Sequence, residues 1–273
     1  MKKNRYKNKQ KQTLQPRNYS RPLIMIIILC IISLGLMYTY DFIMQSTYFN
    51  IKNITLEGNN RINKKEIINF SRINNSHNTL SINLHVVQKR LVHHPWIKAA
   101  FIKRDLPSGL TIKIVEEVPF AIVKIQNIAE IVINNQGKPF KELEPDIDNL
   151  NHLPVIQGLE LAESKGDFNF KGNLLNLALK VLDMNRFGKI YHVKADKNMG
   201  ISIKTKLYNK DITMKLGFSN FHNKAYKAEQ IANYFKKNLI NREISTFDLY
   251  DPENVLVKSK DKDALHNLTK GGV

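Results

Sequence analysis

An uncharged apolar run near the start of the chain limits the possible fold more than any other feature of the sequence. Residues 23–40 read LIMIIILCIISLGLMYTY and contain no charged side chain. Eighteen helical residues at about 1.5 Å each extend roughly 27 Å, close to the thickness of the hydrocarbon core of a bilayer. The run is apolar on every side, unlike a helix that covers a soluble core with one face. The pattern predicts a transmembrane helix over residues 23–40.

The residues on either side of this run predict its orientation. The segment before it, residues 1–22, carries eight Lys and Arg residues and no Asp or Glu. Positive charge is retained on the cytoplasmic side of a membrane, so we expect this basic tail to be cytoplasmic. The bulk of the chain, after a linker at residues 41–48, is then expected in the periplasm or an equivalent compartment. Residues 41–273 keep +10 of the formal net charge of +18.

A cleaved signal peptide is the main alternative to a permanent anchor. Signal peptides have shorter apolar regions, of about 7–15 residues, which are followed by a cleavage site of small residues. The chain continues after Tyr40 as DFIMQSTYF, which contains no such site. We therefore expect a single uncleaved anchor that contacts lipid through residues 23–40.

Composition narrows the class of the remaining chain. Hydrophobic residues make up 42% of the 273 residues and charged residues 24%, a balance that excludes a wholly disordered chain. The single cysteine, Cys30, falls inside the apolar run, which excludes a disulfide framework and a multi-thiolate metal site. The positive charge belongs to the tail and to scattered lysines, without a base-reading motif, so we expect no nucleic-acid binding.

Residues 49–118 predict a small sheet covered by two helices. Strands are expected over 49–58, 96–105 and 110–117, and the last two are joined by a turn that contains Pro and Gly. Two helices lie between the first and second strands, and the first of them starts with a capping box at Asn63–Glu66. The residues expected to face inward from these helices are Ile67, Phe70, Leu80, Leu84, Val87 and Leu91.

Three motifs in this region resemble one known family. They are HPWIK at residues 94–98, KRDLPSGLTI at 103–112 and EEVPFA at 116–121. Their order and spacing, just after a single anchor, resemble the POTRA domain of the FtsQ/DivIB bacterial cell-division proteins. The resemblance implies an α+β fold with an N-terminal transmembrane helix and a POTRA domain of β-α-α-β-β order over residues 49–118. A mostly antiparallel β domain with two helices would follow over residues 119–257.

The pattern of residues 119–257 is compatible with this architecture. Strands are expected at 121–124, 128–133, 201–204 and 212–216, with a hairpin turn at Asn134–Gly137. Apolar residues at helical spacing indicate two helices. The first is marked by Leu174, Ala178, Val181 and Leu182, and the second by Ala225, Ala228, Ala232, Phe235 and Leu239. The polar residues 258–273 are expected to form a flexible tail.

The sequence contains no recognisable catalytic or metal-binding constellation. The motifs of phosphate-binding loops, serine-hydrolase elbows and zinc proteases are absent. The adjacent pair His93–His94 would point about 100° apart on a helix, so we expect both to contact its last carbonyls. Glu116–Glu117 alternate between the faces of a strand and are expected to pair with lysines. Asp248 and Ser245 lack a neighbouring histidine. We therefore expect no enzyme, no catalytic residue, no cofactor and no metal.

The last strand region is the candidate docking site. Thr246–Val257 is the final predicted β region, and the unpaired backbone groups of an edge strand can receive a strand from another chain. An alternative role for Phe247 and Leu249 is to fill the core, which alternation allows for one face of the strand. The candidate partner-binding residues are Thr246, Phe247, Asp248, Leu249, Tyr250 and Val255.

The family resemblance implies the same mode of docking. FtsQ-like proteins are non-catalytic scaffolds of the divisome, at the septum in the inner membrane, which bind the FtsB–FtsL pair through the C-terminal part of the β domain. Their POTRA domain contributes to recruitment. The partner-binding strand falls at Thr246–Tyr250, where the family's D-L-R-Y motif reads Asp248-Leu249-Tyr250 and lacks the Arg. Arg242 or Lys258 would be local substitutes.

A membrane-anchored POTRA protein that assists polypeptide transport or envelope assembly is the alternative function. Such proteins usually carry tandem POTRA repeats or a β-barrel, and the chain shows neither a second copy of the 49–117 pattern nor barrel-length alternating segments. A cell-wall hydrolase or transferase is a third class, for which no motif is found.

Overall fold

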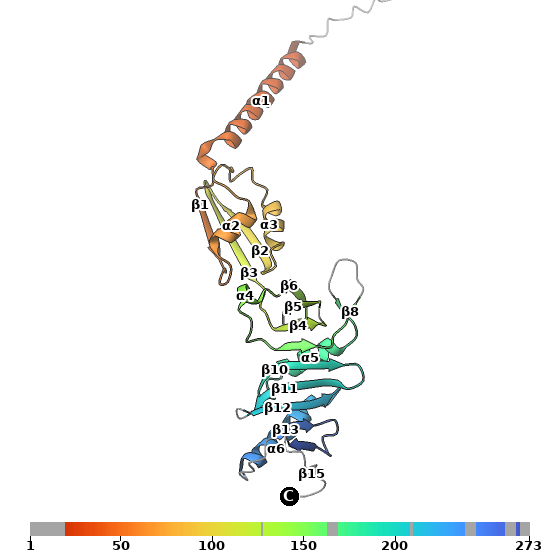
Figure 1. The fold of residues 1–273 in the computed structure, drawn as a ribbon. Helices are drawn as coiled ribbons and strands as arrows, with labels where there is room; N and C mark the ends of the chain where they lie inside the picture. Colours follow the sequence, from red (N-terminus) through yellow and green to blue (C-terminus); the bar gives the residue numbers. More distant parts are fainter. Residues whose placement is uncertain are drawn as a thin grey trace, which may run out of the picture.

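The chain extends from one long helix through a small sheet to a long sheet. The structure is a computed structural model, and it describes residues 20–126, 128–162, 169–207, 210–237, 244–259 and 266–267. In Figure 1 the helix α1 (Ser20–Gln45) leads to the small sheet, and the strands of the long sheet are stacked below it, across the long axis of the molecule. The α+β class predicted from the sequence is confirmed.

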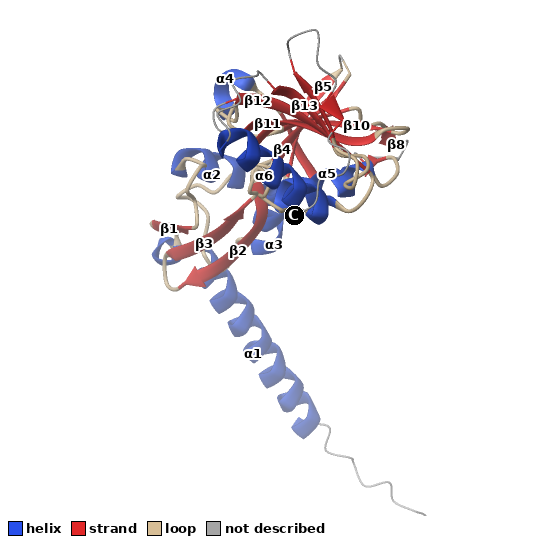
Figure 2. Cartoon of the chain, turned by 90° about the horizontal axis from the view of Figure 1, so that it is seen from below, coloured by secondary structure: helices blue, strands red, loops and turns tan. Residues whose placement is uncertain are grey.

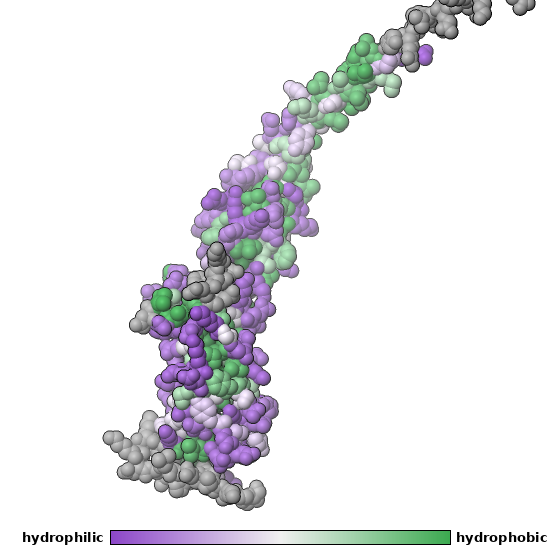
Figure 3. Space-filling view, turned by 90° about the vertical axis from the view of Figure 1, so that its right-hand side faces the viewer, coloured by the Kyte–Doolittle hydropathy of each residue, from purple (hydrophilic) through white to green (hydrophobic). Residues whose placement is uncertain are grey.

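The long helix contains the whole predicted apolar run. It starts three residues before Leu23 and continues through most of the predicted linker, which ends in a short 3-10 helix at Thr47–Phe49. No residue of α1 is buried, and its visible side is predominantly apolar in Figure 3. Among the described residues it is the one helix long and apolar enough to cross a membrane.

The end of α1 is fixed to the small sheet domain by polar contacts. The side-chain amide of Asn78 donates a hydrogen bond to the carbonyl oxygen of Met44, at 2.9 Å, and thereby caps the last turn of α1. Backbone bonds from Thr79 to Phe49 (2.7 Å) and from Ile51 to His77 (3.0 Å) join the two segments as well. We name this set of contacts the anchor joint.

The anchor joint is itself held in place by an arginine of the small sheet. The Arg104 guanidinium donates to the carbonyl oxygens of Thr79 at 2.7 Å and of Ile82 at 2.8 Å. Bonds from a charged donor are stronger than those between neutral groups. Arg104 lies in the KRDLPSGLTI motif, so this motif has a structural role in shaping the loop that caps α1.

The small sheet has the predicted β-α-α-β-β order. It is built from β1 (Asn53–Glu57), β2 (Ile97–Asp105) and β3 (Gly109–Glu116) in the order β1-β3-β2, with β1 and β3 parallel and β2 and β3 antiparallel. The helices α2 (Lys64–Ser71) and α3 (Leu84–Val92) bury apolar residues against it. The core includes Ile67, Val87, Leu91, Leu110 and Ile112.

Local predictions for these helices are partly wrong. Asn63 caps α2 by accepting a bond from the Lys65 backbone, but Glu66 pairs with His94 at 3.1 Å, so the reciprocal half of a capping box is absent. Phe70, expected inside, is 40% exposed and lies edge-on to the His94 ring. Leu80 precedes α3, because Asn83 is the residue that caps its start.

The long sheet contains ten described strands in the order β15-β14-β13-β12-β11-β10-β7-β4-β5-β6. Most neighbouring pairs are antiparallel, while β4–β7, β7–β10 and β12–β13 are parallel. Its strands are β4 (Ala121–Ile125), β5 (Ala129–Ile133), β6 (Pro139–Glu142), β7 (Val155–Gln157), β10 (Lys189–Asp196), β11 (Gly200–Leu207), β12 (Lys210–Gly217), β13 (Ile244–Asp248), β14 (Leu256–Ser259) and β15 (His266–Asn267). A separate small ribbon joins β8 (Leu161–Ala162) to β9 (Asn169–Phe170).

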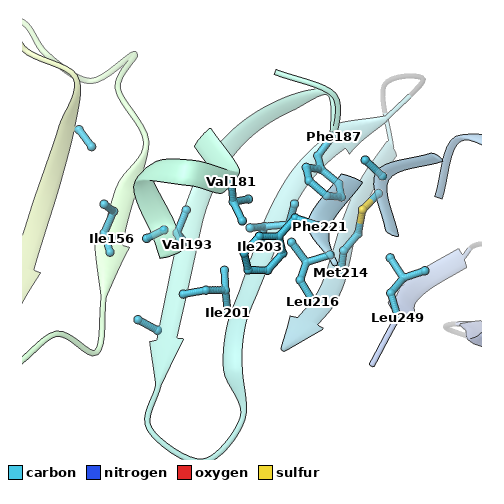
Figure 4. Close-up of a cluster of buried hydrophobic side chains, with 14 of the residues drawn as sticks. Ile156, Val181, Phe187, Val193, Ile201, Ile203, Met214, Leu216, Phe221 and Leu249 are labelled. Atoms are coloured by element: carbon cyan, nitrogen blue, oxygen red, sulfur yellow. The ribbon is translucent and has the colours of Figure 1, made fainter. Parts of the chain in front are cut away.

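Two helices cover one face of the long sheet. The helices α5 (Leu174–Asp183) and α6 (Phe221–Lys237) lie on the same side of it in Figure 2. Every second residue of the central strands points toward them, as Figure 4 shows for Val193, Ile203 and Met214. The expected Leu239 lies outside the described residues. The alternation of buried and exposed residues along β10–β14 leaves the other face of these strands without a helix.

The two sheets share a hydrophobic cluster at their junction. The small-sheet core continues into Ile122, Val132 and Leu150 of the second region, and Trp96 contacts Phe140 edge-on with ring centroids 5.3 Å apart. The Arg61 guanidinium carbon lies 3.9 Å from the centre of the Trp96 ring, a cation–π arrangement. The same guanidinium donates to the Asp148 carbonyl oxygen. Apolar and charge-assisted contacts thus hold the sheets together.

The glutamates at the junction do not pair with lysines, contrary to the prediction. Glu116 accepts hydrogen bonds from the backbone nitrogens of Arg61 and Ile62, at 2.9–3.0 Å. Glu117 accepts one from the side-chain amide of Asn134, at 3.1 Å. Both carboxylates therefore fix loops around the junction, since an ionised carboxylate accepts strong bonds from N–H donors.

A buried ion pair lies beside this junction on a helix that the sequence did not predict. The short helix α4 (Pro145–Asp148) buries Asp148, whose carboxylate lies 2.9 Å from the Lys141 ammonium and also accepts the Glu144 backbone N–H. Burial disfavours the charged Lys141, but hydrogen bonds to Glu144 and Asp148 outweigh this and raise its pKa. The pair is mutually dependent, because either charge alone would be costly to bury.

Replacing Lys141 by Met should therefore destabilise the junction by about 3 kcal/mol, because the Asp148 carboxylate keeps its charge without its cation. Guanidinium unfolding of the full chain in detergent, followed by the fluorescence of Trp96, measures this loss at the junction. The double variant Lys141→Met/Asp148→Asn removes both charges and should recover most of the stability. An unchanged midpoint for Lys141→Met would show that the ion pair contributes nothing.

Candidate docking site

The predicted partner-binding residues lie on and after β13, but three of them are inside the core. Phe247 and Leu249 are fully buried and Val255 is 7% exposed, all in the cluster under α5 and α6. These three side chains are unavailable to a partner in the folded chain. Thr246 and Asp248 are half-buried on the other face, and Tyr250 is 38% exposed. The alternative role in the core therefore applies to Phe247 and Leu249.

Within the predicted edge region Thr246–Val257, the strand β13 has no free side. This strand pairs with β12 in parallel on one side and with β14 in antiparallel on the other, so its backbone has a strand on both sides. The reason is that the chain turns after Asp251 and returns as β14. β14 continues through Lys258 and Ser259, which the sequence analysis assigned to the tail.

The strand β14 is therefore the relevant strand at this end of the sheet. Its outer side is paired at Leu256 and Val257 with the two-residue strand β15. Among the described residues, no strand lies beside Lys258 and Ser259 on that side. Such partly paired backbone is the kind of edge at which a strand from another chain can be added.

The side chain of Tyr250, which follows β13, extends over the end of β12 toward the β10–β11 hairpin. Its hydroxyl donates to the Met199 carbonyl oxygen at 2.6 Å, which connects the end of β13 to the β10–β11 hairpin. Its ring packs on Gly217, where a Cβ atom would lie only 3.0 Å from the ring. Burial, followed by the charges of Asp248 and Asp196, raises the pKa of Tyr250. Tyr250 is thus a neutral, fixed aromatic anchor.

A buried lysine contacts the end of β12, next to the glycine on which Tyr250 packs. Lys224, near the start of α6, is 3% exposed, and its ammonium donates to the Leu216 carbonyl oxygen at 2.6 Å. Burial lowers the pKa of Lys224, and the carboxylates of Asp251 and Asp248 partly oppose that effect. The sequence analysis missed Lys224. A signal was present in the helical spacing. Position 224 lies next to Ala225 and four residues before Ala228, on the side of the helix that these alanines mark as apolar.

The family resemblance predicts an Arg beside Asp248, and this chain has a different cation at that place. Asp248 pairs with Lys215 of the neighbouring β12, with the nitrogen and oxygen 3.3 Å apart. Lys258, one of the two expected substitutes, is an exposed residue of β14 whose backbone is opposite Thr246. The other, Arg242, lies outside the described residues. A cation is therefore present beside Asp248, but it comes from β12.

The histidines and the Ser245–Asp248 pair considered in the sequence analysis have structural partners in the described part of the chain. His93 contacts the Lys89 carbonyl as expected, but His94 turns inward to Glu66. The Ser245 hydroxyl donates to the Lys258 carbonyl oxygen and does not contact Asp248. In the described part of the chain, no group of three His, Cys, Asp or Glu residues is placed to hold a metal ion.

A polar cleft of about 600 Å³ lies at the ends of β4, β7 and β10. Two of its lysines are neutralised by carboxylates, Lys124 by Glu130 and Lys197 by Glu160, both at 2.7 Å. Its lining also contains Gln157, Lys194, Asp196 and Asn198. This set of paired charges and amides lacks the nucleophile and base within hydrogen-bond reach of each other that covalent catalysis requires.

Comparison with known proteins gives a consistent result. The family model described as "POTRA domain, FtsQ-type" matches residues 49–117. The chain is 28% identical over 200 residues to a "Cell division protein FtsQ" of Syntrophotalea carbinolica, covering 71% of this chain and 69% of that protein. A protein of the same name from Geotalea daltonii is 22% identical over 228 residues, or 80% and 79% of the two chains. A "Cell division protein DivIB" of Clostridium tetani is 30% identical over 110 residues, which is 40% of each chain.

The buried amine of Lys224 predicts a specific dependence of stability on pH. Its pKa is lower in the folded chain than in the unfolded chain, so in the window between the two values the unfolded chain binds more protons and stability rises with pH. Relative to Lys224→Met, which cannot titrate, the wild-type melting temperature should rise as the pH approaches 10.5. Lys227→Met changes an exposed position of the same helix. The difference in melting temperature between wild type and Lys227→Met should stay constant over the same pH range. Parallel curves for wild type and Lys224→Met would contradict a lowered pKa.

Proposed function

We propose, because this chain belongs to the FtsQ/DivIB family of cell division proteins, that it is a non-catalytic scaffold of the divisome. The observation that carries this proposal is an FtsQ-type POTRA match at residues 49–117, directly after a membrane-length helix. The scaffold connects early division proteins in the cytoplasm with late ones in the periplasm, at the septum. The alternative in polypeptide transport has no observation of its own in its favour.

The scaffold is anchored in the inner membrane by α1, with its N-terminus in the cytoplasm. The charge distribution supports this orientation, because every charged residue of the segment before Leu23 is basic. The anchor joint then connects α1 directly to the POTRA domain. The POTRA domain lies next to the membrane and is available to other divisome members, while the long sheet extends further into the periplasm.

The docking site for the partner is the β14 edge together with Tyr250. A strand from the FtsB–FtsL pair is added to the outer side of β14, where it takes the place of β15 and continues along Lys258 and Ser259. Tyr250 supplies an aromatic contact that is already fixed by Met199 and Gly217, so little side-chain entropy is lost when the partner binds. Asp248 and Thr246 contribute through their backbones, which pair with Leu256 and Lys258 and so hold β14 in register with β13.

Replacing Tyr250 by Ala should weaken binding of the FtsB–FtsL pair by about tenfold or more, because a fixed, partly exposed aromatic contact is lost. The measurement is co-purification of the full chain with its bound proteins from membranes, followed by their identification. Tyr226→Ala removes an exposed ring from α6 and should leave the bound proteins unchanged. Unchanged binding by Tyr250→Ala would remove this residue from the site, and recovery of translocation components alone would favour the transport function.

A periplasmic enzyme reporter fused after Val273 tests the orientation of the anchor. Alkaline phosphatase folds to its active form outside the cytoplasm, so we expect the fusion to be active in intact cells. A matched fusion of the same reporter before Met1 should be inactive. The reverse pattern would place the long sheet in the cytoplasm and would exclude the proposed partner contact.

A further inference from the structure

The face of the long sheet that α5 and α6 leave uncovered carries a concentration of lysines. Along β10, β11, β12 and β14, the residues that alternate with the buried ones are mostly polar, with the exposed Leu256 of β14 as an apolar exception, and the described sequence contains no helix over them. We call this surface the open face. It is formed by His192, Lys194, Ser202, Lys204, Lys206, Asp211, Thr213, Lys215, Thr246, Asp248, Leu256 and Lys258.

The strand register arranges these residues in two rows across the sheet. In the first row Lys194 is opposite Ser202, which is followed by Lys215 and Asp248 on the next two strands. In the second row His192 is followed by Lys204, Thr213, Thr246 and Lys258. The lysines therefore alternate between rows from one strand to the next, while half-exposed hydroxyl groups fill the positions between them.

The positive charge of the open face is largely unneutralised. Among the described residues, Lys215 has a carboxylate partner in Asp248, but Lys194, Lys204 and Lys258 form no ion pair. The effect reaches a neighbouring side chain: burial and then the charges of Lys204 and Lys194 lower the pKa of His192. Like charges held close together are costly, so this surface favours an anionic ligand.

The orientation of the rows limits the shape of that ligand. The strands lie across the long axis of the molecule, so both rows run along this axis, away from α1 (Figure 1). Neighbouring strands are about 4.8 Å apart and a helical turn advances about 5.4 Å, so one acidic residue per turn can meet successive strands. The small sheet and strands β4–β6 separate the open face from α1, which argues against the lipid surface as the ligand.

We propose that the open face binds an acidic helical segment of a neighbouring protein, aligned with the long axis of the molecule and held by Lys194, Lys204 and Lys258. A neighbour that is itself anchored in the membrane would stand in this direction. The contact uses the face of the sheet and is separate from strand addition at β14. It adds electrostatic steering, which accelerates association and depends on ionic strength. The proposal does not depend on the identity of the partner at the edge.

The test uses an alanine-based helical peptide with one Glu per turn and the full chain in detergent. Wild type should bind this peptide, and Lys194→Glu/Lys204→Glu should bind it at least about tenfold more weakly. The control Lys180→Glu/Lys227→Glu makes the same charge change on α5 and α6 and should weaken binding less than about twofold. All variants keep the basic tail, so binding of the peptide to the tail does not differ among them.

A second measurement localises the peptide on the open face. The pKa of His192, followed by NMR of histidine-labelled protein, should rise when the acidic peptide binds, because nearby carboxylates favour the imidazolium. The same peptide with Gln in place of Glu should not change it. Tyr250→Ala should bind the peptide as wild type does, which separates this surface from the edge.

Three results would overturn the proposal. One is equal binding of the peptide by wild type and Lys194→Glu/Lys204→Glu, and another is an equal loss in the control, which would mean that only net charge matters. The third concerns alginate, an acidic polysaccharide. In this result Lys194→Glu/Lys204→Glu loses binding to alginate that wild type shows, but keeps binding to the peptide. That result would assign the open face to a cell-wall polymer instead of a protein.

Discussion

The hydrophobic cluster that both sheets share is the contact on which the rest of the molecule depends. Trp96 and Phe140 meet across the boundary, and Ile122 and Val132 of the long sheet belong to the core of the small one. Trp96, Ile122 and Val132 are buried, and full burial of an apolar side chain is worth about 1.5–3 kcal/mol, while Phe140 is partly buried. With Arg61 on the Trp96 ring, the boundary is a packed interior rather than a linker. The position of the long sheet relative to the POTRA domain follows from this packing.

The same principle applies at the membrane end of the chain. Asn78 caps the last turn of α1, and Arg104 holds the loop that carries Asn78. The residues between α1 and the POTRA domain are therefore held by hydrogen bonds to the domain. Seen from the bilayer, the anchor joint, the small sheet, the junction and the long sheet form a continuous series of packed or hydrogen-bonded contacts. The chain has the geometry of a rod, with α1 at one end and the last strands of the long sheet at the other (Figure 1).

The sequence predicted the anchor and the small sheet well because each has a strong local pattern. An uncharged apolar run of this length is favourable in the hydrocarbon core of a bilayer. The alternation of apolar and polar residues, together with a turn that contains Pro and Gly, defines β2 and β3. It missed β10, since the bulge between Ile190 and His192 breaks the alternation and its outward residues are polar. It treated Thr246–Val257 as one edge region and did not separate β13 from β14, because the pairing of these strands is a tertiary contact. Lys224 was missed for a related reason: its carbonyl partner comes from another strand.

The open face was also invisible in the sequence, where its lysines are spread over more than sixty residues. Only the register of five strands brings them into two rows. Scattered charge in a sequence is therefore compatible with concentrated charge on a sheet. The reverse holds for Glu116 and Glu117, which are adjacent in sequence but hold different loops.

The orientation of the long sheet has a mechanical consequence. Its backbone hydrogen bonds run along the axis of the rod, because they are perpendicular to strands that lie across it (Figure 1). A pull between the anchor and β14 would thus load these bonds in tension and separate strands one at a time, instead of shearing a whole pair at once. The helices α5 and α6, each packed over several strands, act as splints against such peeling. Under such a pull, β14 would separate from β13 before the inner strands separate from one another.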